Sequence, residues 1–92
     1  MNHDFLTQLG IHAENPGAYD GRWLDTRGPA LVSTNPATGR FIAAVRDASR
    51  ADYDRVVDAA HAAWLRWRLV PAPRRGEYVR RIGEVLRARK DE

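Results

Sequence analysis

Residues 30–45 of the chain read ALVSTNPATGRFIAAV, and this stretch carries the strongest structural signal in the sequence. Two short runs of mostly aliphatic and β-branched residues, 30–34 and 40–45, flank the turn sequence Asn-Pro-Ala-Thr-Gly. Pro36 suits the second position of a type I turn, and Gly39 can supply the positive φ that a following bulge requires. The stretch therefore predicts two strands joined in an antiparallel hairpin.

The residues before this hairpin are rich in turn signals. The sequence Asn-Pro-Gly at positions 15–17 predicts a turn. Asp20 and Gly21 predict a second, tighter hairpin between Tyr19 and the short run 22–24. We therefore expect the N-terminal half to consist of short strands and turns, without a long central strand.

After the hairpin, the apolar residues take the spacing of a helix. Ser49 can accept a hydrogen bond from the backbone N–H of Asp52, whose side chain can return the contact, so a capping box is predicted at the start of the helix. The apolar residues that predict one buried face are Tyr53, Val56, Val57, Ala60, Trp64 and Trp67. Two prolines within residues 70–73 predict the end of this helix.

A second helix is predicted from about Arg74 to the end of the chain. Its apolar stripe consists of Val79, Ile82, Val85 and Leu86. Residues 87–92 contain no Gly, Asn or Pro that would stop the helix, so we expect the pattern to continue beyond the last residue and the chain to be truncated. Since no central strand is present for the two helices to cover, we expect their apolar faces to be exposed.

Length and composition limit the classes of protein that are possible. The chain has 92 residues, enough for one small domain, and 43% of them are hydrophobic and 29% charged, as in globular proteins. It contains no cysteine, which excludes disulfides, thiolate zinc sites and a cysteine nucleophile within these residues. No apolar run approaches the roughly 20 residues of a membrane span, and the first residues lack the features of a signal peptide. We therefore expect a cytoplasmic location and no membrane partner.

The polar residues do not form a recognisable reaction centre. The three histidines, His3, His12 and His61, lack metal-ligand spacing and have no cysteine to join them. Ser33 is interpreted as a strand residue and Ser49 as a helix cap, and neither has a histidine and a carboxylate in a recognisable order. Metal binding and serine nucleophilic catalysis are therefore not expected.

The glycines and tryptophans give no cofactor signature either. Gly10, Gly17 and Gly21 form neither a dinucleotide fingerprint nor a phosphate-binding loop. Trp64 and Trp67 could stack a ligand, but their positions on an alanine-rich apolar stripe favour packing in a core. The sequence thus predicts no catalytic, cofactor-binding or metal-binding residue in this chain.

Positive charge is concentrated in the last third of the chain. The net charge is +3, from 15 basic and 12 acidic residues, and the whole of the excess lies after residue 65, where nine basic residues stand against four acidic ones. One reading is a small basic interaction module that binds nucleic acid through its C-terminal arginine-rich helix. Against it, Glu77 and Glu84 lie among the arginines, and no aromatic platform accompanies them.

Several blocks of sequence, taken in order, point to a known family. They lie at residues 15–23, 33–39, 42–45, 48–53, 62–67, 71–77 and 82–87. The first reads NPGAYDGRW, the second STNPATG and the sixth PAPRRGE. Together they cover the chain from about Leu9 to Lys90, and they resemble the N-terminal segment of NAD(P)-dependent aldehyde dehydrogenases. Within that family, they are most similar to the antiquitin branch, the α-aminoadipic semialdehyde dehydrogenases of lysine catabolism.

This resemblance implies a fold. Residues 1–92 would be an α+β fragment, β-hairpins followed by two helices, from the outer part of a Rossmann-like coenzyme-binding domain truncated at its C-terminus. The partner of this segment would be the remainder of the dehydrogenase chain, in a parent enzyme that is a homo-oligomer.

The resemblance also implies a reaction that this chain alone would not perform. The family oxidises an aldehyde to the carboxylate with NAD or NADP, through a cysteine thiohemiacetal and a glutamate that activates water. Those residues and the cofactor-binding turn would lie outside this chain, which would be scaffold and bind no cofactor. In some members, the backbone at positions matching Ser33 and Thr34 helps coordinate a monovalent cation together with groups that come later in the sequence. Because those later groups would lie outside this chain, we expect no cation site here.

Overall fold

The hairpin at residues 30–45 forms as predicted. The structure, a computed structural model, describes residues 4–92. Strand β2 (Ala30–Thr34) pairs antiparallel with strand β3 (Phe41–Arg46), so the second strand starts and ends one residue later than predicted. Gly39 has a φ of 70°, and the register shifts next to the turn, where Thr34 pairs with Phe41 and Ser33 with Ala43. The extra residue opposite β2 is therefore Ile42, and it makes the bulge that the positive φ indicated.

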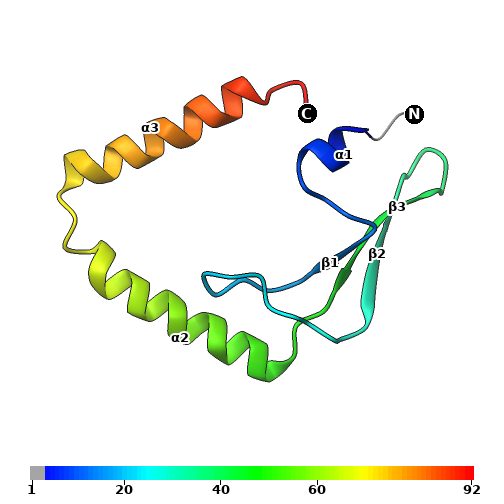
Figure 1. Ribbon diagram of the computed structural model, residues 1–92, viewed down its shortest axis with the longest axis horizontal. Helices are drawn as coiled ribbons and strands as arrows, with labels where there is room; N and C mark the ends of the chain where they lie inside the picture. The colour runs from blue at the N-terminus through cyan, green and yellow to red at the C-terminus, as the bar shows by residue number, and fades with distance from the viewer. Residues whose placement is uncertain (1–3) are drawn as a thin grey trace.

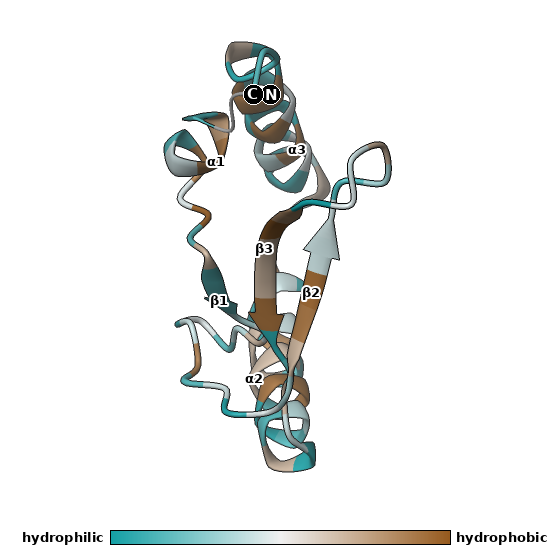
Figure 2. Cartoon of the chain, turned by 90° about the vertical axis from the view of Figure 1, so that its right-hand side faces the viewer, coloured by the Kyte–Doolittle hydropathy of each residue, from teal (hydrophilic) through white to brown (hydrophobic). Residues whose placement is uncertain are grey.

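The predicted turn at residues 15–17 is wrong. Strand β1 (Glu14–Pro16) instead pairs parallel with β3, and the sheet has the order β1-β3-β2 (Figure 2). The side chain of Asn15 holds the strand in place, because its Nδ2 donates to the carbonyl oxygen of His12 at 2.8 Å and to that of Ala44 at 3.1 Å. A proline is tolerated here because β1 is an edge strand. Local turn propensity could not reveal a partner that lies about 30 residues away in the sequence.

A buried threonine joins the connection between β1 and β2 to the sheet. Thr26 has 0% of its surface exposed. Its hydroxyl accepts a hydrogen bond from the backbone N–H of Gly17 at 3.0 Å and donates one to the carbonyl oxygen of Arg46 at 2.9 Å. The Nε of Arg46 in turn donates to the Thr26 carbonyl oxygen at 2.8 Å. Among the described residues, Leu24 and Ala44 are the other two buried ones, so the core is very small.

The turn predicted at Asp20 and Gly21 is confirmed, but its flanking strands are minimal. Tyr19 and Trp23 form a single antiparallel bridge, and their rings meet edge-on with centroids 5.1 Å apart. Gly21 has a φ of 116°, a conformation that favours glycine. The run 22–24 is therefore an extended connection and not a full strand.

Helix α2 (Arg50–Trp67) begins at the predicted capping box. The backbone N–H of Asp52 donates to Ser49 Oγ at 3.1 Å, and the backbone N–H of Ser49 donates to Asp52 Oδ2 at 2.9 Å. A short helix, α1 (Asp4–Gln8), was not predicted.

Helix α3 (Ala72–Ala88) differs from its prediction at both ends. It starts two residues before Arg74, because a proline in the first turn of a helix loses no hydrogen bond and has a suitable φ. It does not run to the end of the chain, since the N–H of Glu92 turns back to the carbonyl oxygen of Arg89 at 3.2 Å. The guanidinium of Arg89 also contacts the Glu92 carboxylate and donates to the Gln8 carbonyl oxygen at 2.7 Å, which draws the chain end towards α1.

The helices extend away from the sheet and do not cover it. In Figure 1, α2 and α3 form two sides of an open frame that returns to α1. The radius of gyration is 16.9 Å, whereas a compact chain of this length has about 12 Å. No residue of α2 or α3 is buried, which confirms that their apolar faces are exposed. Among the described helices, none is both long enough and apolar enough to cross a membrane.

We predict that replacing Thr26 by valine destabilises the chain by about 2 kcal/mol, because the Gly17 N–H and the Arg46 carbonyl would then be buried without partners. A lower midpoint of urea denaturation would be the readout. Thr34→Val is the matched control, since Thr34 is an exposed strand residue. An equal effect of the two substitutions would contradict the role given to Thr26.

We also predict opposite effects for two Gly→Ala substitutions. A Cβ at Gly17 would overlap the backbone oxygen of Arg46, so Gly17→Ala should lower stability by about 2 kcal/mol. A Cβ at Gly76, within α3, meets nothing, so Gly76→Ala should raise helix stability by about 0.5–1 kcal/mol. Circular dichroism during thermal unfolding measures both changes, and a neutral Gly17→Ala would show that the loop does not pack against β3 as described.

Candidate functional site

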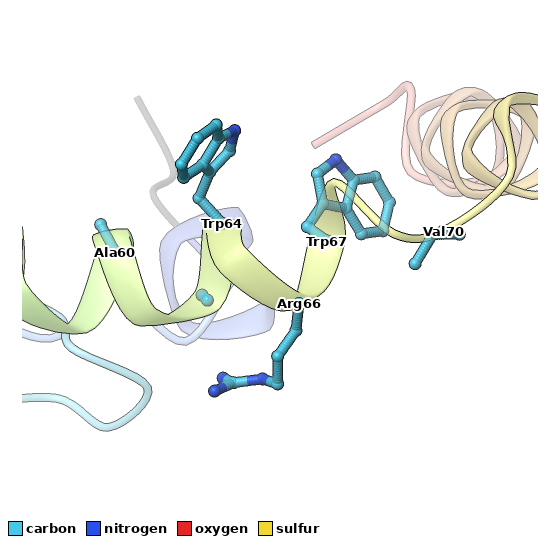
Figure 3. A pocket seen from close by; sticks show the side chains of 6 residues that line it. Ala60, Trp64, Arg66, Trp67 and Val70 are labelled. Atoms are coloured by element: carbon cyan, nitrogen blue, oxygen red, sulfur yellow. The ribbon is translucent and has the colours of Figure 1, made fainter.

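The largest apolar side chains gather at the C-terminal end of α2. Trp64 and Trp67 are 50% and 41% exposed, so they do not form a core within the described residues as the sequence suggested. Figure 3 shows both indole rings on one side of the helix, whereas the side chain of Arg66 points to the other. The hollow around them has an almost entirely apolar surface, and its other lining residues are Ala60, Ala63, Arg66 and Val70.

This apolar surface continues onto α3. The rings of Trp67 and Tyr78 are in contact, with centroids 5.3 Å apart, across the bend between the two helices. A second hollow on α3 is lined by the apolar residues Tyr78, Ile82, Val85 and Leu86, all of which are exposed, and by Arg81. We call the surface formed by Trp64, Trp67 and these four residues the helix face. It has the character of a packing surface, because it offers apolar area and almost no polar groups.

An ion pair links α2 to the turn at Asp20, in the connection between β1 and β2. Asp20 Oδ2 lies 3.0 Å from Arg55 Nε, and the side chain of Asp20 is only 16% exposed. Its other oxygen, Oδ1, accepts the backbone N–H of Arg22 at 3.1 Å, so the carboxylate also stabilises the tight turn. The helix face is therefore tied to the sheet through a turn residue, in addition to the backbone between β3 and α2.

Part of the positive charge of α3 is already paired. The guanidinium of Arg80 binds Glu77, with Nη2 2.6 Å from Oε1, and also contacts Glu84 one turn further on. The hydrogen bond from Arg80 keeps the pKa of the Glu77 carboxyl below its usual value, and the nearby charge of Arg81 lowers it further. The Glu77 carboxylate therefore stays ionised at neutral pH and reduces the net positive field that a nucleic acid would meet.

The histidines do not come together. His12 lies in the connection between α1 and β1, and His61 lies on α2 with its ring 5.7 Å from that of Trp64. His3 lies outside the described residues. Within residues 4–92, no group of three or more His, Asp or Glu side chains is placed to hold a metal ion.

The described residues also offer no cradle for a dinucleotide. Gly10 ends α1, Gly17 packs against β3 and Gly21 forms a separate turn, so they do not share one phosphate-binding loop. The N-terminus of α2 is closed by its own capping box, and the carboxylates of Asp52 and Asp54 would repel a phosphate there. NAD or NADP therefore does not fit the residues present.

The remaining predicted positions have structural roles. Ser49 is the helix cap, as predicted, and Ser33 and Thr34 lie in β2 beside the bulge. Sequence reasoning missed Thr26, Asn15 and Asp20, which hold the loops to the sheet and to α2. Asn15 and Asp20 each lie in a sequence that predicts a turn, so the local signal was visible. Their partners Ala44 and Arg55 are distant in the sequence and could not be found from it.

Comparison with known proteins gives consistent matches along the chain. Residues 23–92 match the family model described as the aldehyde dehydrogenase family. The chain is 48% identical over 83 residues to the α-aminoadipic semialdehyde dehydrogenase of Bos taurus, which covers 90% of this chain and 15% of that protein. It is 44% identical over 91 residues to aldehyde dehydrogenase family 7 member A1 of Pisum sativum, covering 98% of this chain and 18% of that protein.

These relatives are several times longer than this chain, which spans less than a fifth of each. The family model matches more than half of the chain. The matched residues include the hairpin of β2 and β3, α2 and α3, and these elements follow one another in the same order as the resembling blocks of sequence. The chain therefore belongs to the aldehyde dehydrogenase family.

Proposed function

We propose that this chain is the N-terminal scaffold segment of an NAD(P)-dependent enzyme that oxidises an aldehyde to the carboxylate. The substrate we propose is α-aminoadipic semialdehyde, because relatives at 48% and 42% identity carry that name. The partner of the segment is then the remainder of a dehydrogenase chain, in a homo-oligomeric parent. The location in the cytoplasm stays a prediction of the sequence.

The observation that supports a scaffold role is the exposed helix face. Fully burying a large apolar side chain contributes about 1.5–3 kcal/mol to stability. No side chain of α2 or α3 makes this full contribution, since none of their residues is buried. Helices of this length gain most of their stability from packing an amphipathic face. The helix face thus has the composition expected of a surface that packs on a larger body.

The chemistry of the proposed reaction would come from groups outside these residues. It needs a cysteine nucleophile to form the thiohemiacetal, and this chain contains no cysteine. The bound coenzyme would accept the hydride, but the described residues do not fit it. No reaction step can therefore be assigned to a side chain of this segment, whose contribution is to the shape and stability of the domain.

The alternative, a basic module that binds nucleic acid, receives no support from the relatives. Arg80 and Arg81 lie against Glu77, and Arg89 lies against Glu92, so several arginines of the C-terminal region are engaged within the chain.

The 92-residue chain alone is expected to bind neither NAD nor NADP and to oxidise no aldehyde, since it lacks a cysteine and a phosphate-binding loop. Calorimetric titration with each nucleotide tests binding, and the appearance of NADH absorbance with α-aminoadipic semialdehyde tests turnover. Saturable binding of either nucleotide would contradict the scaffold proposal.

A chimera tests the family role directly. We expect that this chain, placed in the Pisum sativum relative instead of the 91 residues that it matches, gives a soluble enzyme that still oxidises aldehyde. Trp64→Asp should abolish soluble enzyme, because a carboxylate would be forced into an apolar contact. Ala62→Asp is the matched control, because Ala62 is an exposed residue of α2 that does not line this hollow, and it should keep most of the activity. If both variants behave alike, the helix face is not the packing surface.

A further inference from the structure

The connection between β1 and β2 contains the sequence Asp20-Gly21, whose two residues can react with each other. The backbone nitrogen of a residue can attack the carboxyl carbon of an aspartate that precedes it, and glycine hinders this attack least because it has no Cβ. Of the eight aspartates and three asparagines of the chain, Asp20 is the only one that glycine follows. Asn15 and Asn35 are each followed by proline, which has no N–H.

The structure brings the two reacting groups of this pair together. Asp20 Oδ1 accepts the backbone N–H of Arg22 at 3.1 Å, two residues further along the chain. A side chain that makes this bond folds back along the peptide group between the two residues, which brings the Asp20 carboxyl carbon towards the Gly21 nitrogen. Gly21 is exposed, and among residues 4–92 its N–H has no hydrogen-bond acceptor. The attacking nitrogen is therefore not held by another interaction.

Arg55, on α2, holds the other oxygen of the carboxylate. Its Nε lies 3.0 Å from Asp20 Oδ2, and the Asp20 side chain is only 16% exposed. Before a ring can form, one carboxyl oxygen must take up a proton and leave as water. A guanidinium is a donor that does not release its proton, so its contact with Oδ2 opposes this step. With both oxygens engaged, the carboxyl group also cannot rotate freely.

We propose that Asp20 is a site of isoaspartate formation that is controlled by Arg55. When the ion pair opens, the Gly21 nitrogen loses its proton and bonds to the Asp20 carboxyl carbon, and one carboxyl oxygen leaves as water. Water then opens the cyclic imide at one of two bonds. Cleavage between the nitrogen and the carboxyl carbon restores aspartate, whereas cleavage between the nitrogen and the original carbonyl carbon gives isoaspartate. The mass is unchanged, and water is the only other reactant.

Isoaspartate at position 20 releases α2 from the turn. The main chain then runs through the former side chain, and the remaining carboxylate is attached directly to Cα. This carboxylate is one methylene shorter, so it cannot bind both Arg55 and the Arg22 N–H as Asp20 does. The additional main-chain atom also lies between Tyr19 and Trp23, which form the bridge of the turn. The ion pair that protects Asp20 therefore does not form again.

Removing the guanidinium tests this control. During incubation of the 92-residue chain at neutral pH, Arg55→Ala should form isoaspartate at position 20 about fivefold faster than the parent chain, as expected for the loss of one partly buried ion pair. A protein isoaspartyl methyltransferase measures the amount, and electron-transfer fragmentation in a mass spectrometer locates the residue. Arg50→Ala is the matched control, because Arg50 pairs with Asp54 on the same helix, and it should react at the rate of the parent chain.

A peptide with the sequence of residues 15–25 gives the rate without α2. The parent chain should react more slowly than this peptide, and Arg55→Ala should approach the rate of the peptide. Sodium chloride screens the ion pair, so it should accelerate the parent chain and leave both the peptide and Arg55→Ala unchanged. The salt series keeps the proposal testable if circular dichroism shows that Arg55→Ala does not fold.

Equal rates for the parent chain and the peptide would overturn the proposal, because α2 would then give no protection. A folded Arg55→Ala that reacts no faster than the parent chain would overturn it as well. Acceleration by Arg50→Ala equal to that by Arg55→Ala would show a general loosening of α2 and would exclude a specific role of Arg55. Isoaspartate that appears first at another aspartate, such as Asp25, would refute the assignment of the site.

Discussion

The hydroxyl group of Thr26 is the contact on which the arrangement of the N-terminal half depends. It bonds at once to the N–H of Gly17, just after β1, and to the carbonyl oxygen of Arg46, at the end of β3. A residue in the middle of a long connection thereby holds together the adjacent C-terminal ends of two parallel strands. Because the core contains few buried side chains, directional hydrogen bonds carry a share of the stability that apolar packing carries in larger domains.

The C-terminal half depends on local interactions instead. The capping box at Ser49 and Asp52 fixes where α2 begins, and the ion pair of Asp20 with Arg55 connects it to the sheet. Neither interaction buries the apolar residues of α2 and α3, so the helix face keeps its area exposed to solvent. A surface of that kind is consistent with a segment of a larger dehydrogenase, in which the face would pack against further structure.

The helix face and the β2 edge are different kinds of surface. The helix face offers apolar area, which attracts any complementary apolar surface without a fixed direction. The edge offers hydrogen-bonding groups at Ala30, Val32 and Thr34, which accept only an extended strand in register.

The sequence by itself determined the elements whose signals are local: the hairpin around Asn35 and Gly39, the turn at Gly21 and the capped start of α2. It also determined the family, because the resembling blocks recur in order. Only the tertiary structure decided that residues 14–16 are a strand and that Thr26 is buried. These features rest on hydrogen bonds between residues distant in the sequence, and local propensity contains no information about such partners.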